Sequence, residues 1–451
     1  MGDPAAVFLA YDIRGLVPEH LDTELARLVG GAFTRLVRRR EPDTGRIILG
    51  RDMRESGVEL AGAFADGITA EGLDVVDLGL VSTDMLYFAS GYLDAPGAVF
   101  TASHNPAGYN GIKLCLSAAR PVGADSGLAE MQADLSAGPQ AGGGATGTTT
   151  TLDLLDAFAD HVRSFVDTTT LAPLTVVADT ANGMGGLVVP AVFDGLPLDL
   201  EVMYADLDGT FPNHPADPLQ PDNLVALQER VLATGADIGL AFDGDADRVF
   251  LVDEKARPVS GSLTTALVAS TVLSHQPGAT VIHNLICSRS VPEAIAEHGG
   301  RAVRSRVGHS YIKELMATEG AAFAGEHSGH YYFADNYRAD SGLIAALFVL
   351  EALSTSDGTL SDLLAPFDRY AASGEINFSV DDPAAATERV SLAYAATGSQ
   401  DTLDGLTVDM GAWWFNLRPS NTEPLLRLNL EAATATDCAD RLAEVSALIA
   451  Q

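Results

Sequence analysis

The feature that most constrains the fold is an alternation of strand-like and helix-like segments. Apolar runs typical of buried strands lie at 46–50, 74–79, 97–103, 174–179, 237–245, 279–284, 301–305 and 321–325. Helical periodicity separates them at 55–70, 152–166, 262–274, 309–317 and 341–353, and in a segment from Ser290. This pattern predicts βαβ units with largely parallel sheets. Residues after about 370 hold a strand, a helix, three strand-like runs and a terminal helix over 436–450, which predicts a small α+β domain.

A low-complexity stretch divides the first third of the chain from the rest. Residues 136–150, SAGPQAGGGATGTTT, offer almost no apolar surface to bury, so we expect a flexible linker there. Together with the ends of the successive strand–helix units, this stretch predicts four domains at 1–148, 149–253, 254–369 and 370–451.

The charge balance excludes one class of partner. The chain has 27 Lys and Arg residues against 61 Asp and Glu, a net charge of -34, which repels nucleic acid. We expect no membrane partner, because no apolar run approaches 18 residues. Three cysteines lie far apart without a CxxC pair, so a cytoplasmic protein is expected. We also expect a monomer or a homodimer.

Thr101–Pro106, TASHNP, directly follows an apolar strand. Open α/β sheets bind ligands at the carboxyl ends of their strands, so Ser103 is placed as a nucleophile or phosphoryl carrier. A capping serine before an Asn-Pro turn is an equally good local interpretation. The nearby GYNGIK segment favours function, because it brings Lys113, one of only three lysines, towards the serine.

A second strand ends in DGDADR, residues 243–248, with aspartates at 243, 245 and 247. Alternating carboxylates beside a glycine make a hard oxygen site for Mg²⁺ or Ca²⁺. An EF-hand is excluded because Arg248 occupies the required glycine position and the flanks look like strands. A solvated acidic turn is the remaining alternative, but carboxylates this close to an apolar strand favour a bound cation.

Two further loops are rich in polar groups. Residues 325–330, GEHSGH, combine a carboxylate, a hydroxyl and imidazoles that suit the hydroxyl groups of a sugar. Residues 418–424, RPSNTEP, combine a guanidinium group, hydroxyls and turn N–H groups that suit a phosphate. A zinc site in the first loop and a plain Pro-rich turn in the second are the alternatives.

With these four segments, YDIRG at 11–15, GRD at 50–52 and the FPNHPADPL run from Phe211, the whole chain resembles the α-D-phosphohexomutase superfamily. Within it, the SNTEP form of the last loop resembles the bacterial phosphomannomutase/phosphoglucomutase enzymes. The resemblance implies an α/β fold of three related domains with mixed sheets and a smaller C-terminal α+β domain around a central cleft. It also implies a phosphoserine, a hexose 1,6-bisphosphate intermediate that serves as activator, and Mg²⁺.

Carried over position by position, the resemblance implies these site residues. The catalytic residues would be Ser103, Lys113, Arg248, His330 and Arg14. The substrate-binding residues would be His309, Glu326, Ser328, Arg418, Ser420, Asn421 and Thr422. The Mg²⁺ ligands would be Ser103, through its phosphate, and Asp243, Asp245 and Asp247. The domains at 1–148, 149–253, 254–369 and 370–451 would carry the phosphoserine, the metal, the sugar and the second phosphate in that order.

Other functions remain as alternatives. A phosphoglucosamine mutase or a glucose-only phosphoglucomutase of the same superfamily would use the same four loops. A Mg²⁺-dependent sugar phosphatase of the haloacid-dehalogenase type would use Asp243 as its nucleophile, and a Ca²⁺-binding protein would use only the aspartates. Both of these leave the serine loop unexplained.

Overall fold

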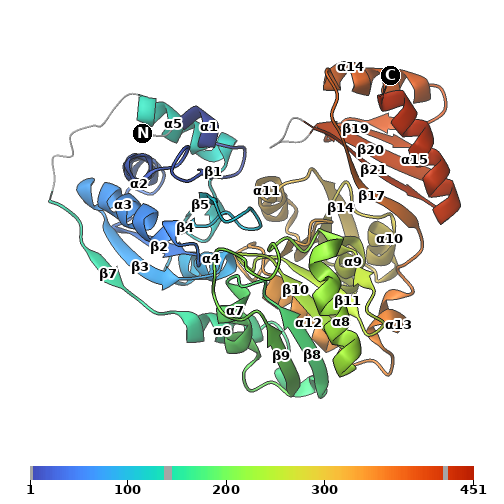
Figure 1. The fold of residues 1–451 in the computed structure, drawn as a ribbon, viewed down its shortest axis with the longest axis horizontal. Helices are drawn as coiled ribbons and strands as arrows, with labels where there is room; N and C mark the ends of the chain where they lie inside the picture. Colours follow the sequence, from blue (N-terminus) through green and yellow to red (C-terminus); the bar gives the residue numbers. More distant parts are fainter. Residues whose placement is uncertain (1–3, 137–144, 420–424, 451) are drawn as a thin grey trace. The chain divides into compact units, whose positions relative to one another are not determined.

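The computed structural model describes residues 4–136, 145–419 and 425–450 (Figure 1). The chain forms two compact units, which are described separately below. The first unit is Met1–Ser260 with Ser328–Leu363, and the second is Gly261–His327 with Leu364–Gln451. Among the described residues, no helix combines the length and the hydropathy needed to cross a membrane.

The first unit begins with a mixed sheet in the order β1-β5-β4-β2-β3-β7, with β6 beside β5. Its strands are β1 (Ile13–Leu16), β2 (Arg46–Arg51), β3 (Asp74–Leu80), β4 (Gly97–Phe100), β5 (Tyr109–Leu116), β6 (Arg120–Pro121) and β7 (Thr149–Thr151). Its helices are α1 (Pro4–Val7), α2 (Thr23–Arg40), α3 (Ser56–Ala70), α4 (Thr83–Tyr92) and α5 (Leu128–Ser136). β2 runs parallel to β3 and β4, whereas β5 runs antiparallel to β4 and β1.

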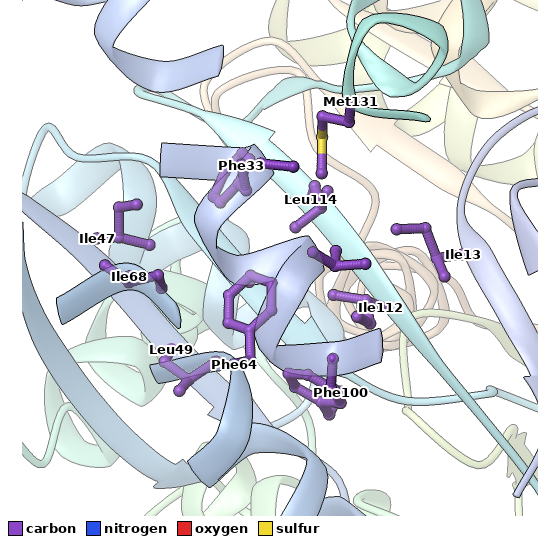
Figure 2. Packing of buried hydrophobic residues seen from close by; sticks show 14 of the residues in the cluster. Ile13, Phe33, Ile47, Leu49, Phe64, Ile68, Phe100, Ile112, Leu114 and Met131 are labelled. Atoms are coloured by element: carbon purple, nitrogen blue, oxygen red, sulfur yellow. The ribbon is translucent and has the colours of Figure 1, made fainter. Parts of the chain in front are cut away.

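Helices α2 and α3 cover one face of this sheet. Figure 2 shows Phe64 of α3 within the buried cluster, and its ring packs edge-on against Phe100 with centroids 5.4 Å apart. Ile47 and Leu49 of β2 belong to the same cluster, while the intervening Ile48, also fully buried, faces the other side, where α4 packs. Because side chains alternate along a strand, burying both faces fixes the register of β2 and the position of its carboxyl end.

A second mixed sheet in the first unit has the order β12-β11-β10-β8-β9. Its strands are β8 (Leu174–Asp179), β9 (Leu198–Met203), β10 (Ile238–Phe242), β11 (Val249–Asp253) and β12 (Pro258–Val259). The helices along this part are α6 (Leu155–Arg163), α7 (Gly185–Phe193) and α8 (Val225–Thr234). The unit also contains β16 (Tyr331–Phe333) and α12 (Gly342–Ser354), and α13 (Leu360–Leu364) follows. β10 lies parallel to β8 but antiparallel to β11, so residues 243–248 form the hairpin loop between β10 and β11.

The second unit contains α/β and antiparallel parts. In the first part, β13 (Thr280–Asn284) lies parallel to β14 (Arg301–Ser305) and β15 (Phe323–Gly325), with α9 (Gly261–His275), α10 (Ser290–Glu297) and α11 (His309–Glu319). The second part is an antiparallel sheet, β17-β21-β20-β19-β18. Its elements are β17 (Ala371–Phe378), α14 (Pro383–Tyr394), β18 (Ser399–Asp401), β19 (Leu406–Asp409), β20 (Trp413–Pro419), β21 (Leu426–Ala432) and α15 (Ala435–Ile449). Both helices contribute to the core over this sheet, Val390 from α14 and Val445 from α15.

The structure corrects two sequence predictions. The predicted linker at 136–150 ends too late, because Thr149–Thr151 forms β7 and pairs in parallel with β3; residues 137–144 lie outside the described part. The helix predicted over 152–166 is only α6, Leu155–Arg163, and the Ser164 hydroxyl caps its end by donating to the His161 carbonyl at 2.6 Å. Both errors concern segment ends, where local pattern competes with capping and tertiary pairing.

Two glycines in α3 should respond oppositely to alanine. A Cβ at Gly67 would lie 2.0 Å from the Arg27 carbonyl of α2, whereas one at Gly62 meets nothing within 4 Å. We expect Gly67→Ala to destabilise the protein by about 1–3 kcal/mol through overpacking. Gly62→Ala, the matched control, should stabilise it by about 0.5–1 kcal/mol through helix propensity. Urea unfolding followed by circular dichroism measures both, and a neutral Gly67→Ala would contradict the packing.

Candidate functional site

Ser103 lies at the carboxyl end of β4, where the chain turns towards β5. β4 ends at Phe100, and Ser103 adopts the left-handed region with φ of 49°. Its backbone N–H donates to the Thr101 Oγ1 at 2.9 Å, and the residue is only 5% exposed. A buried non-glycine residue in this backbone region is held by its surroundings, and such strain is concentrated at functional sites.

The Ser103 hydroxyl contacts both an anion and a cation. Its Oγ donates to the Asp243 Oδ2 at 2.7 Å and accepts from the Arg248 Nη2 at 3.1 Å. Arg248 also forms an ion pair with Asp243 at 2.7 Å, and its Nη2 lies 2.6 Å from the His104 Nδ1. The hydroxyl therefore lies beside a carboxylate and a guanidinium group on the loop between β10 and β11.

The three aspartates of that loop point to one place. Asp243, Asp245 and Asp247 are at most 1% exposed, and they offer oxygens within 4.8 Å of one another. Ala246 takes a positive φ of 59°, which lets the short loop turn its carboxylates inwards. Lys113 of β5 donates to the Asp245 Oδ2 at 2.7 Å and to the Asp247 Oδ2 at 2.6 Å.

Burial and neighbouring charges shift these groups in different directions. Burial raises the pKa of Asp243 to about 7, although the Arg248 guanidinium opposes the shift. Burial also disfavours the Asp245 anion, but the Lys113 ammonium and its hydrogen bond hold the pKa of Asp245 below its usual range. Burial lowers the pKa of Lys113, but Asp245 and Asp247 outweigh it and hold that pKa well above its ordinary value. The negative charge of the three carboxylates is therefore only partly neutralised by the two cations, Lys113 and Arg248.

The donor set fits a hard divalent cation. Among the described residues, the Asp245 Oδ1 and the Asp247 Oδ1 are buried and accept no hydrogen bond. Buried carboxylate oxygens normally have a partner, and an oxygen-only set with this charge is what Mg²⁺ or Ca²⁺ prefers. The cluster could therefore hold a metal ion.

Two more predicted residues lie near this cluster. The His330 Nδ1 lies 2.9 Å from the Asp340 Oδ2 and 3.8 Å from the Asp247 Oδ1, and a β-bridge joins His330 to Arg248. Arg14 of β1 donates to the Asn105 Oδ1 at 2.5 Å and to the Ala102 carbonyl at 3.3 Å. Arg14 thus contacts the Ser103 loop, while His330 faces the aspartates.

The sequence interpretation missed three polar residues around the site. The Thr83 Oγ1, at the start of α4, donates to the Asp245 Oδ2 at 2.6 Å. Asp340 is the hydrogen-bond partner of His330, as described above. The guanidinium group of Arg54 donates a hydrogen bond to the Ser103 carbonyl at 2.9 Å. No local motif marks Thr83 or Asp340; Arg54 lies two residues after the GRD segment, which was the only available signal.

In the second unit, two predicted substrate-binding residues lie together. The Glu326 Oε2 accepts from the Gly308 N–H at 3.3 Å and from the Asn284 Nδ2 at 3.1 Å. His309 is the first residue of α11, directly after Gly308, so Glu326 lies at the amino end of that helix. Ser328 begins the segment that belongs to the first unit.

Arg418 is 4% exposed on β20, and its Nη2 lies 3.3 Å from the Glu375 Oε2. Glu375 also pairs with Arg427 of β21 at 3.2 Å. The predicted phosphate-binding residues Ser420, Asn421 and Thr422 lie outside the described residues.

Comparison with known proteins identifies the family. Models of the phosphoglucomutase/phosphomannomutase α/β/α domains I, II and III match residues 5–134, 156–257 and 260–370, and the model of the C-terminal domain matches 375–448. The phosphohexose mutases of Xanthomonas campestris pv. campestris are 41% identical over 94% of both chains. A phosphomannomutase of Salmonella montevideo is 39% identical, again over 94% of both.

A crystal structure of a phosphoglucomutase/phosphomannomutase family protein from Burkholderia thailandensis matches the fold. The TM-score is 0.90, with 31% identity, over 100% of this chain and 98% of the other. The chain belongs to the phosphoglucomutase/phosphomannomutase family, and it is an enzyme of the isomerase class that transfers phosphate within hexoses. The predicted three α/β domains followed by a smaller C-terminal α+β domain are confirmed.

Asp84 of α4 gives the site region a pH-dependent stability. It is fully buried and accepts from the Ser341 Oγ at 2.7 Å, and burial raises its pKa to about 7. In the unfolded chain the Asp84 carboxyl ionises at about pH 4. The contribution of Asp84 to the free energy of unfolding is therefore fully present below that pH and is lost as the pH rises to about 7.

We therefore expect Asp84→Asn to gain stability relative to wild type by about 2–3 kcal/mol between pH 5 and pH 8. Urea unfolding at both pH values measures the difference. Asp199→Asn, at an exposed position of β9, is the control. An Asp84→Asn effect of equal size at both pH values would contradict the assignment.

Proposed function

We propose that this enzyme is a phosphomannomutase/phosphoglucomutase that uses Ser103 as its phosphoryl carrier. The observation that carries the proposal is the Ser103 Oγ, held at 2.7 Å from Asp243 and 3.1 Å from Arg248 at a strand end. Phosphoryl transfer depends on positioning and on neutralising the oxygens of the transferred group. A hydroxyl beside a guanidinium group and a candidate metal cluster meets both requirements.

In the proposed reaction, phosphorylated Ser103 gives its phosphoryl group to the free hydroxyl of a hexose monophosphate. The bond from phosphorus to the Ser103 Oγ breaks as the bond to the sugar oxygen forms, which gives a hexose 1,6-bisphosphate. The proton of the sugar hydroxyl passes to His330, which Asp340 orients through Nδ1. The released Ser103 oxygen takes up a proton and becomes a hydroxyl again. The bisphosphate then turns over and returns its other phosphoryl group to Ser103: the hydroxyl gives up its proton as the new Oγ–phosphorus bond forms, and the released sugar oxygen takes a proton back from His330. Free bisphosphate can phosphorylate Ser103 in the same way, so it acts as activator.

We propose that Arg248, Lys113 and Arg14 bind the phosphoryl oxygens. Arg248 already contacts the Ser103 Oγ, and Arg14 bonds to the loop that carries it. A Mg²⁺ ion held by the three aspartates and an oxygen of phosphorylated Ser103 would neutralise charge on the transferred group. The orphaned buried oxygens of Asp245 and Asp247 support this assignment.

For substrate recognition we propose roles that follow the family resemblance. Glu326 and Ser328 would bind sugar hydroxyls, with His309 assisting, and the carboxylate of Glu326 beside the start of α11 supports this. Arg418, Ser420, Asn421 and Thr422 would hold the phosphate that does not react. Because the relatives include phosphomannomutases, we propose mannose phosphates as the preferred substrates of this enzyme and glucose phosphates as its second substrate pair.

Ser103→Ala should abolish isomerisation, because it removes the oxygen that carries the phosphoryl group and leaves the fold intact. We expect kcat to fall by about 10⁴-fold or more, a loss typical of removing a nucleophile. Conversion of mannose 1-phosphate to mannose 6-phosphate, followed by ³¹P NMR with glucose 1,6-bisphosphate present, is the measurement. Ser164→Ala, which removes an exposed hydroxyl at the end of α6, should keep wild-type turnover. Substantial turnover by Ser103→Ala would show that another group carries the phosphate.

Asp245→Asn should weaken Mg²⁺ binding by about 10- to 100-fold, because it removes one of three ligand charges while keeping the side-chain shape. Calorimetric titration with Mg²⁺ measures the affinity without relying on activity. Asp208→Asn, a change at a carboxyl that caps a turn through Thr210, serves as the control. Equal Mg²⁺ affinity in Asp245→Asn and wild type would remove the metal assignment.

A further inference from the structure

Arg54 is a buried arginine whose two terminal nitrogens donate only to the backbone around Ser103. It is 1% exposed and lies between β2 and α3. Its Nη2 donates to the carbonyls of Ser103 at 2.9 Å and Asn105 at 2.7 Å, and its Nη1 to those of Pro106 at 2.9 Å and Tyr109 at 3.0 Å. The Nε donates to the Asp52 Oδ2 at 3.2 Å. The five N–H groups of the guanidinium fork are thereby all engaged.

These bonds fix the loop between β4 and β5 from one side. The Ser103 carbonyl is held by Arg54, and a Cβ on Gly244 would approach the same oxygen to 2.4 Å. With its carbonyl oxygen fixed and φ at 49°, Ser103 keeps its Oγ directed at Asp243. We propose that Arg54 is a positioning residue, which holds the Ser103 loop in the geometry needed for phosphoryl transfer.

The ion pair with Asp52 does not by itself account for this arginine. Burying an ion pair such as Arg54–Asp52 costs desolvation free energy, and apolar residues of similar volume are often as stabilising. An apolar residue would, however, leave four carbonyls of the loop without their donor. What Arg54 provides is one rigid fork that sets the positions of several peptide groups at once.

The FPNHPADPL segment has no role in the proposed reaction itself, but its first residue packs against the Arg54 guanidinium group. The Phe211 ring lies 5.1 Å from the Arg54 guanidinium carbon, and Phe211 has a positive φ of 54°. Two residues before the segment, a Cβ on Gly209 would lie 2.7 Å from the Arg54 Cα, so the chain leading into the segment also packs closely on Arg54. An aromatic ring at a strained backbone position is retained by its surroundings, here as the cation–π partner that covers the guanidinium group.

The inference rests on the proposed role of Ser103 as carrier, and Arg54→Lys tests it. Lysine keeps the charge, but its three donors on a flexible chain cannot reproduce the fork. A misplacement of about 1 Å costs roughly 10²-fold in rate, so phosphorylation of Ser103 by glucose 1,6-bisphosphate should slow by about 10- to 100-fold. The KM for mannose 1-phosphate should change little, because Arg54 bonds to backbone behind the reacting hydroxyl.

Two further variants complete the experiment. Phe211→Leu removes the aromatic cover but keeps the guanidinium group, and a smaller, several-fold slowing is expected. Arg163→Lys is the matched control, because Arg163 also donates to two backbone carbonyls, those of Ala191 at 2.8 Å and Val192 at 3.1 Å, at the end of α7. Rapid-quench mass spectrometry gives the phosphorylation rate, and circular dichroism gives the folded fraction and the melting temperature.

A slowed phosphorylation in fully folded Arg54→Lys, with Arg163→Lys unaffected, supports the proposal. Phosphorylation at the wild-type rate, or a loss that only follows the folded fraction, overturns it. If Arg54→Lys does not fold, Phe211→Leu decides: a wild-type rate in that variant overturns the proposal. If wild-type Ser103 itself is never phosphorylated, the carrier function fails and this inference with it, which is a distinct result.

Discussion

The site depends on the burial of three carboxylates next to two cations. Asp243, Asp245 and Asp247 are removed from water, and Arg248 and Lys113 neutralise only part of their charge. Charges in a low-dielectric interior interact strongly, and leaving one of them unpaired is costly. The positions of the loop and of β5 are consequently tied to one another, because each carries a member of this charge cluster. The Ser103 turn is tied to the loop by the hydrogen bonds of the Ser103 Oγ with Asp243 and Arg248.

Glycines allow the loops to approach closely enough for these contacts. A Cβ at Gly244 would meet the Ser103 carbonyl at 2.4 Å, and one at Gly183 would meet the Gly244 carbonyl at 2.6 Å. A third close approach is at Gly111 of β5, where a Cβ would lie 2.7 Å from the Thr101 carbonyl oxygen. The Gly-rich turn after β8, the aspartate loop and the Ser103 loop therefore pack backbone against backbone. Side chains from each can then meet at hydrogen-bond distance.

Local pattern located most of the elements, apart from the ends of two segments, and it selected motif residues that the fold brings close together. β8 is Leu174–Asp179 as expected, and Ser103 follows its strand with Asp243 opposite. Thr83, Asp340 and Arg54 could not be predicted, because each acts on a residue brought near by the fold rather than by the sequence. The Thr83 contact to Asp245 spans 162 positions. Periodicity reports which face of an element is buried, but it does not report which polar groups meet across two sheets.

The acidic character of the chain adds a condition to anion binding. With a net charge of -34, the protein repels hexose phosphates at a distance, although salt screens this repulsion beyond about 8 Å. In the aspartate cluster itself, the three carboxylates outnumber the two cations that pair with them, Lys113 and Arg248, so when all three are ionised the cluster is negative. The divalent cation proposed above would reverse that sign, so its binding and the binding of a phosphate dianion should favour each other. In a protein this acidic, the local charge of the aspartate cluster, rather than the field of the whole surface, determines whether the site can accept a phosphate.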